Sequence, residues 1–155
     1  MNANSARRSW LAACGLLLAA PARAVLGEDL ASVHADALRL KARRQVQGAL
    51  GVQVHVLVPP LGGTIRQFAT AQGRVFAVAW NTPYKPRLDQ LLGTHFAAYA
   101  EGGARLQAER AGIQRAARVQ QGDLVVEATA HLQAHRGLAY LKSQLPAGLT
   151  ADALR

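Results

Sequence analysis

An acidic residue and a histidine stand four positions apart in a segment with the period-two pattern of a strand. Glu127, in the run 124–130, and the following His131 alternate onto one face of that strand. A carboxylate beside an imidazole is a common pair for general acid–base catalysis. These residues leave open a small hydrolase, although polar residues along one strand face more often form a solvated surface.

The histidines His131 and His135 have the spacing that brings two metal ligands together on a helix. No glutamate lies in the usual position between them, and they lack a third ligand. On a strand, residues four apart are separated by about 13 Å. We therefore predict neither a metal site nor a cofactor.

An arginine among aromatic residues is the better candidate for recognition. The sequence Ala-Gln-Gly at 71–73 is typical of a three-residue hairpin turn with Gly73 in the left-handed conformation. That turn would pair the strands 64–70 and 74–80, so that one face carries Arg66, Phe68, Phe76 and Trp80. Such a surface suits a carboxylate, a phosphate or a sugar. The alternative is a second core layer under the N-terminal helix, from which the guanidinium reaches solvent.

Other nucleophiles are absent or poorly placed. The only cysteine is Cys14, which lies in an N-terminal segment that we expect to be removed. Beyond that segment the serines are Ser32 and Ser143, and neither stands in a Gly-x-Ser-x-Gly setting. The pair at 62–63 is Gly-Gly after a strand, but it lacks the Lys-Ser/Thr of a phosphate-binding loop. The mature chain therefore has no thiol chemistry and little prospect of serine catalysis.

A sheet and two helices must position these residues. Strands are predicted at 52–58, 64–70, 74–80 and 124–130, with a further strand or short helix near 138–141. Apolar spacing predicts an N-terminal helix over 30–47 and a main helix over 87–101, in which Gly93 indicates close packing. Residues 104–121 are expected to form a surface helix or a mobile connection. We predict a single α+β domain over 25–155, with an antiparallel sheet of four to five strands packed by one main helix plus the N-terminal helix.

Residues 1–24 have the three parts of a signal peptide. Arg7 and Arg8 form a basic start, and 10–20 is an apolar run too short to span a bilayer. Ala22 and Ala24 form the small-x-small motif that signal peptidase requires, and Val25 is the expected first residue of the mature protein. We expect cleavage after Ala24 and a periplasmic or secreted protein with no transmembrane span in its mature part.

Two other export routes remain open from the sequence. Leu-Ala-Ala-Cys at 11–14 resembles a lipoprotein acylation box, but the apolar run continues well past Cys14, so this route is less expected. Arg7 and Arg8 followed by Ser-Trp-Leu also resemble a twin-arginine signal. Paired arginines are common in ordinary basic starts, and the sequence does not separate the general route from the twin-arginine route.

The charge balance indicates a class of partner. The chain has 18 Lys and Arg against 9 Asp and Glu, a formal net charge of +9, and removal of three arginines with the signal peptide leaves +6. Basic charge attracts surfaces that carry phosphate or carboxylate. The basic residues are scattered and not interleaved with aromatic residues, which argues against nucleic acid. We expect an envelope protein or an anionic envelope component as the partner.

Motifs along most of the mature chain resemble one known family. They include Gly73-Arg-Val-Phe-Ala-Val-Ala-Trp80, the helix opening from Pro86 to Phe96, Gly122-Asp-Leu-Val-Val126 and Leu145-Pro-Ala-Gly148. The set is similar to short exported bacterial proteins grouped as domain-of-unknown-function family 2844. The resemblance implies export from a Gram-negative cell and brings no activity, cofactor or catalytic residue. The favoured function is an exported periplasmic binding or accessory module, and the alternative is a small periplasmic hydrolase that uses Glu127 and His131.

Overall fold

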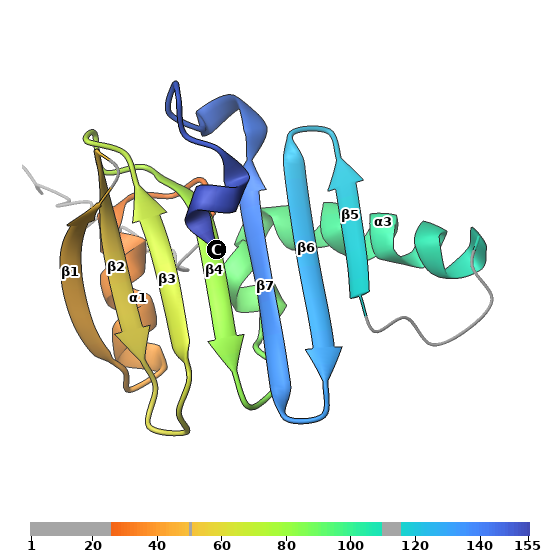
Figure 1. The fold of residues 1–155 in the computed structure, drawn as a ribbon, viewed down its shortest axis with the longest axis horizontal. Coiled ribbons are helices and arrows are strands. Elements are labelled where there is room, and N and C mark those ends of the chain that lie inside the picture. The colour runs from red at the N-terminus through yellow and green to blue at the C-terminus, as the bar shows by residue number, and fades with distance from the viewer. Residues whose placement is uncertain (1–25, 50, 110–115) are drawn as a thin grey trace, which may run out of the picture.

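The computed structural model describes residues 26–49, 51–109 and 116–155 (Figure 1). Within them, seven strands form one antiparallel sheet in the order β1-β2-β3-β4-β7-β6-β5. The strands are β1 (Arg43–Ala49), β2 (Val52–Val58), β3 (Thr64–Ala69), β4 (Val75–Thr82), β5 (Ala116–Gln121), β6 (Leu124–His131) and β7 (Ala134–Leu141). Two meanders therefore meet in the middle of the sheet, where β4 lies against β7.

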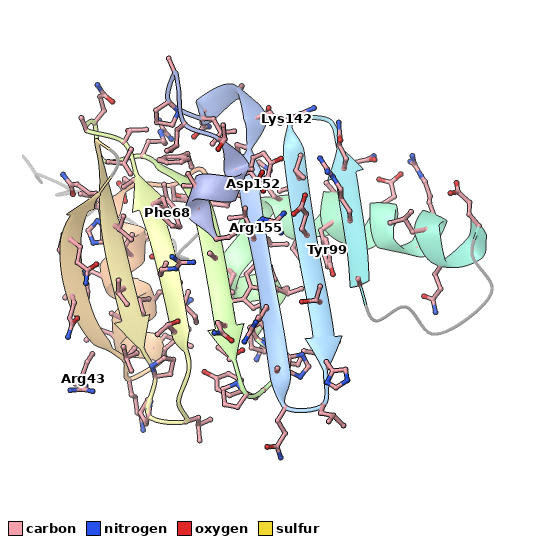
Figure 2. All side chains as sticks on the ribbon, in the orientation of Figure 1. Arg43, Phe68, Tyr99, Lys142, Asp152 and Arg155 are labelled. Carbon is pink, nitrogen blue, oxygen red and sulfur yellow. The ribbon has the colours of Figure 1, made fainter. Side chains whose placement is uncertain are left out.

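The two longer helices lie on the same side of the sheet, which we call the covered face. In Figure 1, α1 (Leu30–Arg39) lies behind β1 to β3, and α3 (Phe96–Glu109) crosses behind β7, β6 and β5. The short elements α2 (Leu88–Leu92) and η1 (Gly93–His95) lead from β4 into α3. After β7 the chain turns to the opposite side, the open face, with η2 (Lys142–Gln144) and η3 (Ala151–Leu154). Figure 2 shows Arg155 in front of this face.

Each face of the sheet has its own apolar core. The larger core, on the covered face, includes Val33, Leu57, Val78, Trp80, Leu92 and Val126. The smaller core, on the open face, includes Val54, Phe68, Phe76, Val125, Tyr140 and the buried Leu154 of η3. Residues 75–80 of β4 are all buried because this strand lies between the two cores. A strand that is buried on both faces reads as a continuous apolar run, which is what its sequence shows.

The prediction of four to five strands is wrong, because both edge strands were missed. The predicted helix over 30–47 ends at Arg39, Lys41 adopts a φ of 50°, and the chain enters the sheet as β1. The segment 104–121 forms the end of α3 and then β5. The described side chains of β1 and most of those of β5 are exposed or half-buried. Edge strands of this kind lack the apolar alternation that identifies an inner strand.

The main helix differs from the one predicted over 87–101. Gly93 adopts a φ of 48° and ends α2, and the helix resumes as α3 and continues to Glu109. Close packing occurs at a different glycine, because a Cβ added to Gly102 would lie 2.5 Å from Cγ1 of Val119 on β5. Gly102 is therefore the residue that lets α3 approach the sheet.

The turn between β3 and β4 forms as predicted. The backbone amide of Thr70 donates to the carbonyl of Arg74 over 2.9 Å, and Gly73 has a φ of 80°. Glycine takes this left-handed conformation without steric cost. The sequence therefore identified both the position and the type of this hairpin turn.

The register beyond that turn differs from the prediction because β4 carries a bulge. Phe76 is an extra residue on β4, so Phe68 pairs with Ala77 and Ile65 pairs with Trp80. A one-residue bulge turns the later side chains of a strand to the other face. Trp80 consequently lies in the covered-face core, and the expected single-face grouping of the arginine with three aromatic residues is wrong.

Several expectations concern residues outside the described ranges. The predicted cleavage residues Ala22, Ala24 and Val25, together with Cys14, all lie outside them. Among the described helices, none has the length and apolar character needed to cross a bilayer.

Candidate functional site

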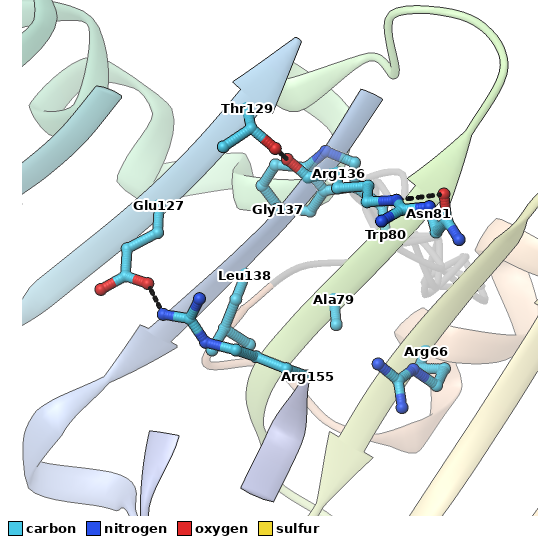
Figure 3. Close-up of a pocket in the computed structure, with 10 residues that line it drawn as sticks. All are labelled: Arg66, Ala79, Trp80, Asn81, Glu127, Thr129, Arg136, Gly137, Leu138 and Arg155. Carbon is cyan, nitrogen blue, oxygen red and sulfur yellow. Dashed lines mark hydrogen bonds and ion pairs between the residues drawn. The ribbon is translucent and has the colours of Figure 1, made fainter. Parts of the chain in front are cut away.

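The open face is hollowed between β3 and β6, beside the last residue of the sequence (Figure 3). We call this hollow the arginine groove, and its volume is about 460 Å³. The lining residues come from four strands and from the end of η3, and they are Arg66, Ala79, Trp80, Asn81, Glu127, Thr129, Arg136, Gly137, Leu138 and Arg155. Three of the ten carry a guanidinium group, and one carries a carboxylate.

The groove has room because small residues lie on its central strands. Ala79 on β4 is paired with Arg66 on β3 and with Leu138 on β7, so only a methyl group separates these neighbours. On the covered face, Gly137 of β7 is paired with Trp80, and a Cβ at Gly137 would lie 2.1 Å from Cζ2 of that ring. The tryptophan therefore requires glycine at position 137.

Arg66 is half-buried and is held by neutral groups. Its Nη2 donates to the carbonyl of Leu154 over 3.2 Å, and its guanidinium carbon lies 5.7 Å from the ring centroid of Phe68. The ring and the carbonyl orient the planar guanidinium without neutralising its charge. Arg66 thus keeps donor groups and a full positive charge at one side of the groove.

Arg136 lies at the other side and is also held by a neutral group. Its Nε donates to Oδ1 of Asn81 over 3.3 Å, and the Thr129 hydroxyl donates to its backbone carbonyl over 3.4 Å. In the described ranges, neither Arg66 nor Arg136 forms an ion pair with a carboxylate. Two guanidinium groups therefore face the groove with uncompensated charge.

The third groove arginine is compensated. Arg155 forms an ion pair with Glu127 (Figure 3). It forms a second ion pair, of 3.3 Å, with Asp152. Glu127 also pairs with Arg118 of β5 over 3.3 Å. The lining as a whole has three arginines and one glutamate, so its net charge is positive by two. An anion would meet attraction from this groove, and a cation would meet repulsion.

The aromatic residues predicted for the binding surface are buried. Phe68 is 2%, Phe76 0% and Trp80 4% exposed. Phe68 and Phe76 pack together in the open-face core with ring centroids 6.4 Å apart. Of the four predicted binding residues, only Arg66 presents its functional group to solvent at the groove. The aromatic residues are therefore core residues, but they do not form one layer under the N-terminal helix, because Phe68 and Phe76 lie on the open face and Trp80 on the covered face.

The predicted acid–base pair does not come together. Glu127 and His131 lie four residues apart along β6, a separation of about 13 Å in a strand. Glu127 is occupied by two arginines, and His131 is exposed at the end of its strand. The neighbouring His135 pairs with Ala130, so it faces the covered side while His131 faces the open side. Across the described part of the chain, no group of three or more His, Cys, Asp or Glu could hold a metal.

A buried polar cluster lies on the covered face under α1. Asp36 is 1% exposed and accepts a hydrogen bond of 2.9 Å from Nε2 of Gln67. Burial raises the pKa of Asp36 to about 6, and the bond from Gln67 and the charge of Arg39 only partly oppose this shift. His55, which accepts a bond of 3.3 Å from Arg44, is also buried, and burial lowers its pKa. Because Asp36, His55 and Gln67 are at most 2% exposed, we assign this cluster to the packing of α1.

Sequence reasoning missed most of the groove. Asn81 follows the end of the strand predicted at 74–80, and Arg136 precedes the strand or short helix predicted near 138–141, so neither residue was placed on a strand. Arg155 gave no signal, since nothing in the local sequence shows that η3 folds back over the sheet. Only the pairing of β4 with β7 brings these residues to Arg66.

Comparison with known proteins yields a family and no characterised relative. The sequence pattern of a family described as protein of unknown function (DUF2844) matches residues 22–154. No curated protein and no protein of solved structure matches the chain. The match covers every strand and helix described above, and it carries no assigned activity.

Proposed function

The chain belongs to the family of proteins of unknown function DUF2844, and we propose that it is an exported envelope module that binds an anionic partner in the arginine groove. The observation that carries this proposal is the pair of guanidinium groups, Arg66 and Arg136, which face the groove without a carboxylate partner among the described residues. The ligand class is a phosphate- or carboxylate-bearing component of the envelope.

The chemistry of arginine supports this ligand class. A guanidinium offers several N–H donors in one plane, and the geometry matches two oxygens of a carboxylate or a phosphate. Arg66 and Arg136 each use one donor on a neutral oxygen, which leaves other donors for a ligand. The groove offers no nucleophile paired with a base, so it is suited to binding rather than to hydrolysis.

The sequence supports export. A basic start, an apolar run and the motif ending at Ala24 match a signal peptide, as argued above. An exported domain without cysteine must be stabilised by apolar packing, and the two cores of this sheet provide it. Intact mass of the protein made in a Gram-negative host tests this part. A periplasmic species that begins at Val25 supports it, and an acylated species that retains Cys14 would contradict cleavage after Ala24.

Calorimetric titration with inorganic pyrophosphate tests the groove. We expect saturable binding that weakens as salt is added, because salt screens exposed charges. The double variant Arg66→Gln, Arg136→Gln should lose at least tenfold in affinity, since hydrogen bonds to charged groups contribute about 1.5–3 kcal/mol each.

The matched control is Arg105→Gln. Arg105 is an exposed arginine of α3 that pairs with Glu101, away from the groove. Its replacement removes one positive charge, against two in the double variant, and should leave the affinity for pyrophosphate within twofold. Equal losses in the double variant and the control would show that net charge, and not the groove, attracts the anion.

A further inference from the structure

The edge strand β1 leaves one border of the sheet open. It pairs with β2 over residues 43–49 in an unbroken register, and no other described strand pairs with it. In an antiparallel pair, alternate residues turn their N–H and C=O groups away from the partner. The outer border of β1 therefore offers backbone donors and acceptors to an additional strand.

A second groove lies between this strand and α1, and we call it the edge groove. Its volume is about 580 Å³, and its lining includes Leu38 and Lys41 on the helix side and Arg44 and Val46 on β1. Leu38 is 67% and Val46 54% exposed. A strand added to β1 would place every second side chain beside these two apolar residues.

The border is also basic. Lys41, Arg43 and Arg44 lie within four positions, and none of them forms an ion pair with a carboxylate in the described part of the chain. Arg43 extends outward from the border of the sheet (Figure 2). Within the described residues, Nε of Arg44 donates to Nδ1 of His55, which is not a carboxylate. Nothing described on this border supplies negative charge.

We propose that β1 binds an extended acidic peptide as an additional strand, with one apolar side chain of the peptide between Leu38 and Val46. Main-chain hydrogen bonds to the free border supply affinity, and the edge groove supplies specificity. Carboxylates of the peptide lie near Lys41 and Arg43. A second copy of this chain fits less well, because it would bring its own three basic residues to the same border. This site is separate from the arginine groove and does not depend on it.

The test uses a terminally blocked peptide of alternating glutamate and valine, seven residues long, with the purified protein. Hydrogen exchange followed by nuclear magnetic resonance should show protection of β1 amides when the peptide is added. A matched peptide with methyl groups on alternate backbone nitrogens should bind at least tenfold more weakly, because it cannot complete the ladder.

Two variants of the protein locate the site. Leu38→Asp and Arg43→Glu should each weaken binding at least tenfold. Leu132→Asp is the matched control, since Leu132 is 89% exposed in the turn between β6 and β7. The affinity of this variant for the peptide should stay within twofold of that of the parent.

Three results would overturn the proposal. The first is that the methylated peptide binds as tightly as the unmethylated one. The second is that the peptide protects amides of β5 or of the open face instead of amides of β1. The third is that protection of β1 amides increases with protein concentration in the absence of peptide. The last result would identify a second copy of the chain as the occupant.

Discussion

The two faces of the sheet differ in what their polar residues do. On the covered face, Asp36 and Gln67 are buried and bonded to each other under α1. On the open face, Arg66 and Arg136 donate to neutral oxygens, have no carboxylate partner in the described ranges, and reach solvent in a groove. Packing explains the first pair and does not explain the second.

This difference separates residues that hold the fold from residues that are available for a ligand. A buried carboxylate is tolerated when neighbours donate to it, and removing those neighbours has a cost in stability. Exposed guanidinium groups without carboxylate partners contribute little to stability. We therefore expect substitutions on the covered face to change the free energy of unfolding, and substitutions in the arginine groove to change affinity.

The largest effect is expected for Leu92→Ala on the covered face. Leu92 is fully buried in the larger core, and truncation of such a side chain costs about 2–5 kcal/mol of unfolding free energy. Denaturant unfolding measures this loss. Pyrophosphate affinity of the folded variant should stay within twofold of the parent, and a large loss of affinity would break the separation between the faces.

The next effect is a dependence of stability on pH that arises from Asp36. Its pKa in the folded protein is about 6, above the ordinary 3.8, so the folded state holds its proton more tightly. The contribution of Asp36 to stability is therefore fully present below about pH 4 and is lost as pH rises through 6, by roughly 3 kcal/mol. Asp36→Asn removes this titration, so the variant should match the parent near pH 4 and exceed it at pH 8. The assignment would be contradicted if the free energies of unfolding of the parent and the variant changed by the same amount between pH 4 and pH 8.

A smaller effect, a gain in affinity for pyrophosphate, is expected for Glu127→Gln. The change removes the negative charge of the groove and frees Arg155 and Arg118 from their common partner. The Coulomb term between exposed charges a few ångströms apart is about 1 kcal/mol, so pyrophosphate should bind about fivefold more tightly. Calorimetry at low salt measures the change, and weaker binding would show that Glu127 orients the groove rather than opposing the anion.

The smallest change in stability is expected for Arg136→Gln. Arg136 is exposed and its guanidinium donates to Oδ1 of Asn81, so the free energy of unfolding should shift by no more than about 0.5 kcal/mol. Affinity for pyrophosphate should fall severalfold in the same variant. A clear loss of stability without a loss of affinity would place Arg136 with the packing residues of the covered face.

The same contrast explains what the sequence could predict. The inner strands β2, β3, β4 and β6 were predicted close to their observed bounds, because alternation or continuous burial leaves a local pattern. The edge strands β1 and β5 leave no such pattern, since exposed strands accept polar residues on both faces. The bulge at Phe76 has no distinctive residue, so the face of Trp80 was assigned incorrectly.

The groove was harder to predict than the sheet for a topological reason. Arg136 meets Asn81 across 55 positions, and Arg66 meets Leu154 across 88. Local periodicity carries no information on such pairs. Arg66 was singled out because the predicted hairpin placed it on one face with aromatic residues, whereas its partners became visible only with the pairing of β4 and β7.

The most direct test of the central claim is a titration of the isotope-labelled protein with pyrophosphate, followed by amide chemical shifts. We predict saturable shifts that concentrate on the open face, at the amides of Arg66, Asn81, Arg136 and Arg155, while α1 and α3 remain unchanged. Shifts that spread over the covered face, or that rise without saturation over the whole molecule, would contradict the assignment of anion binding to the arginine groove.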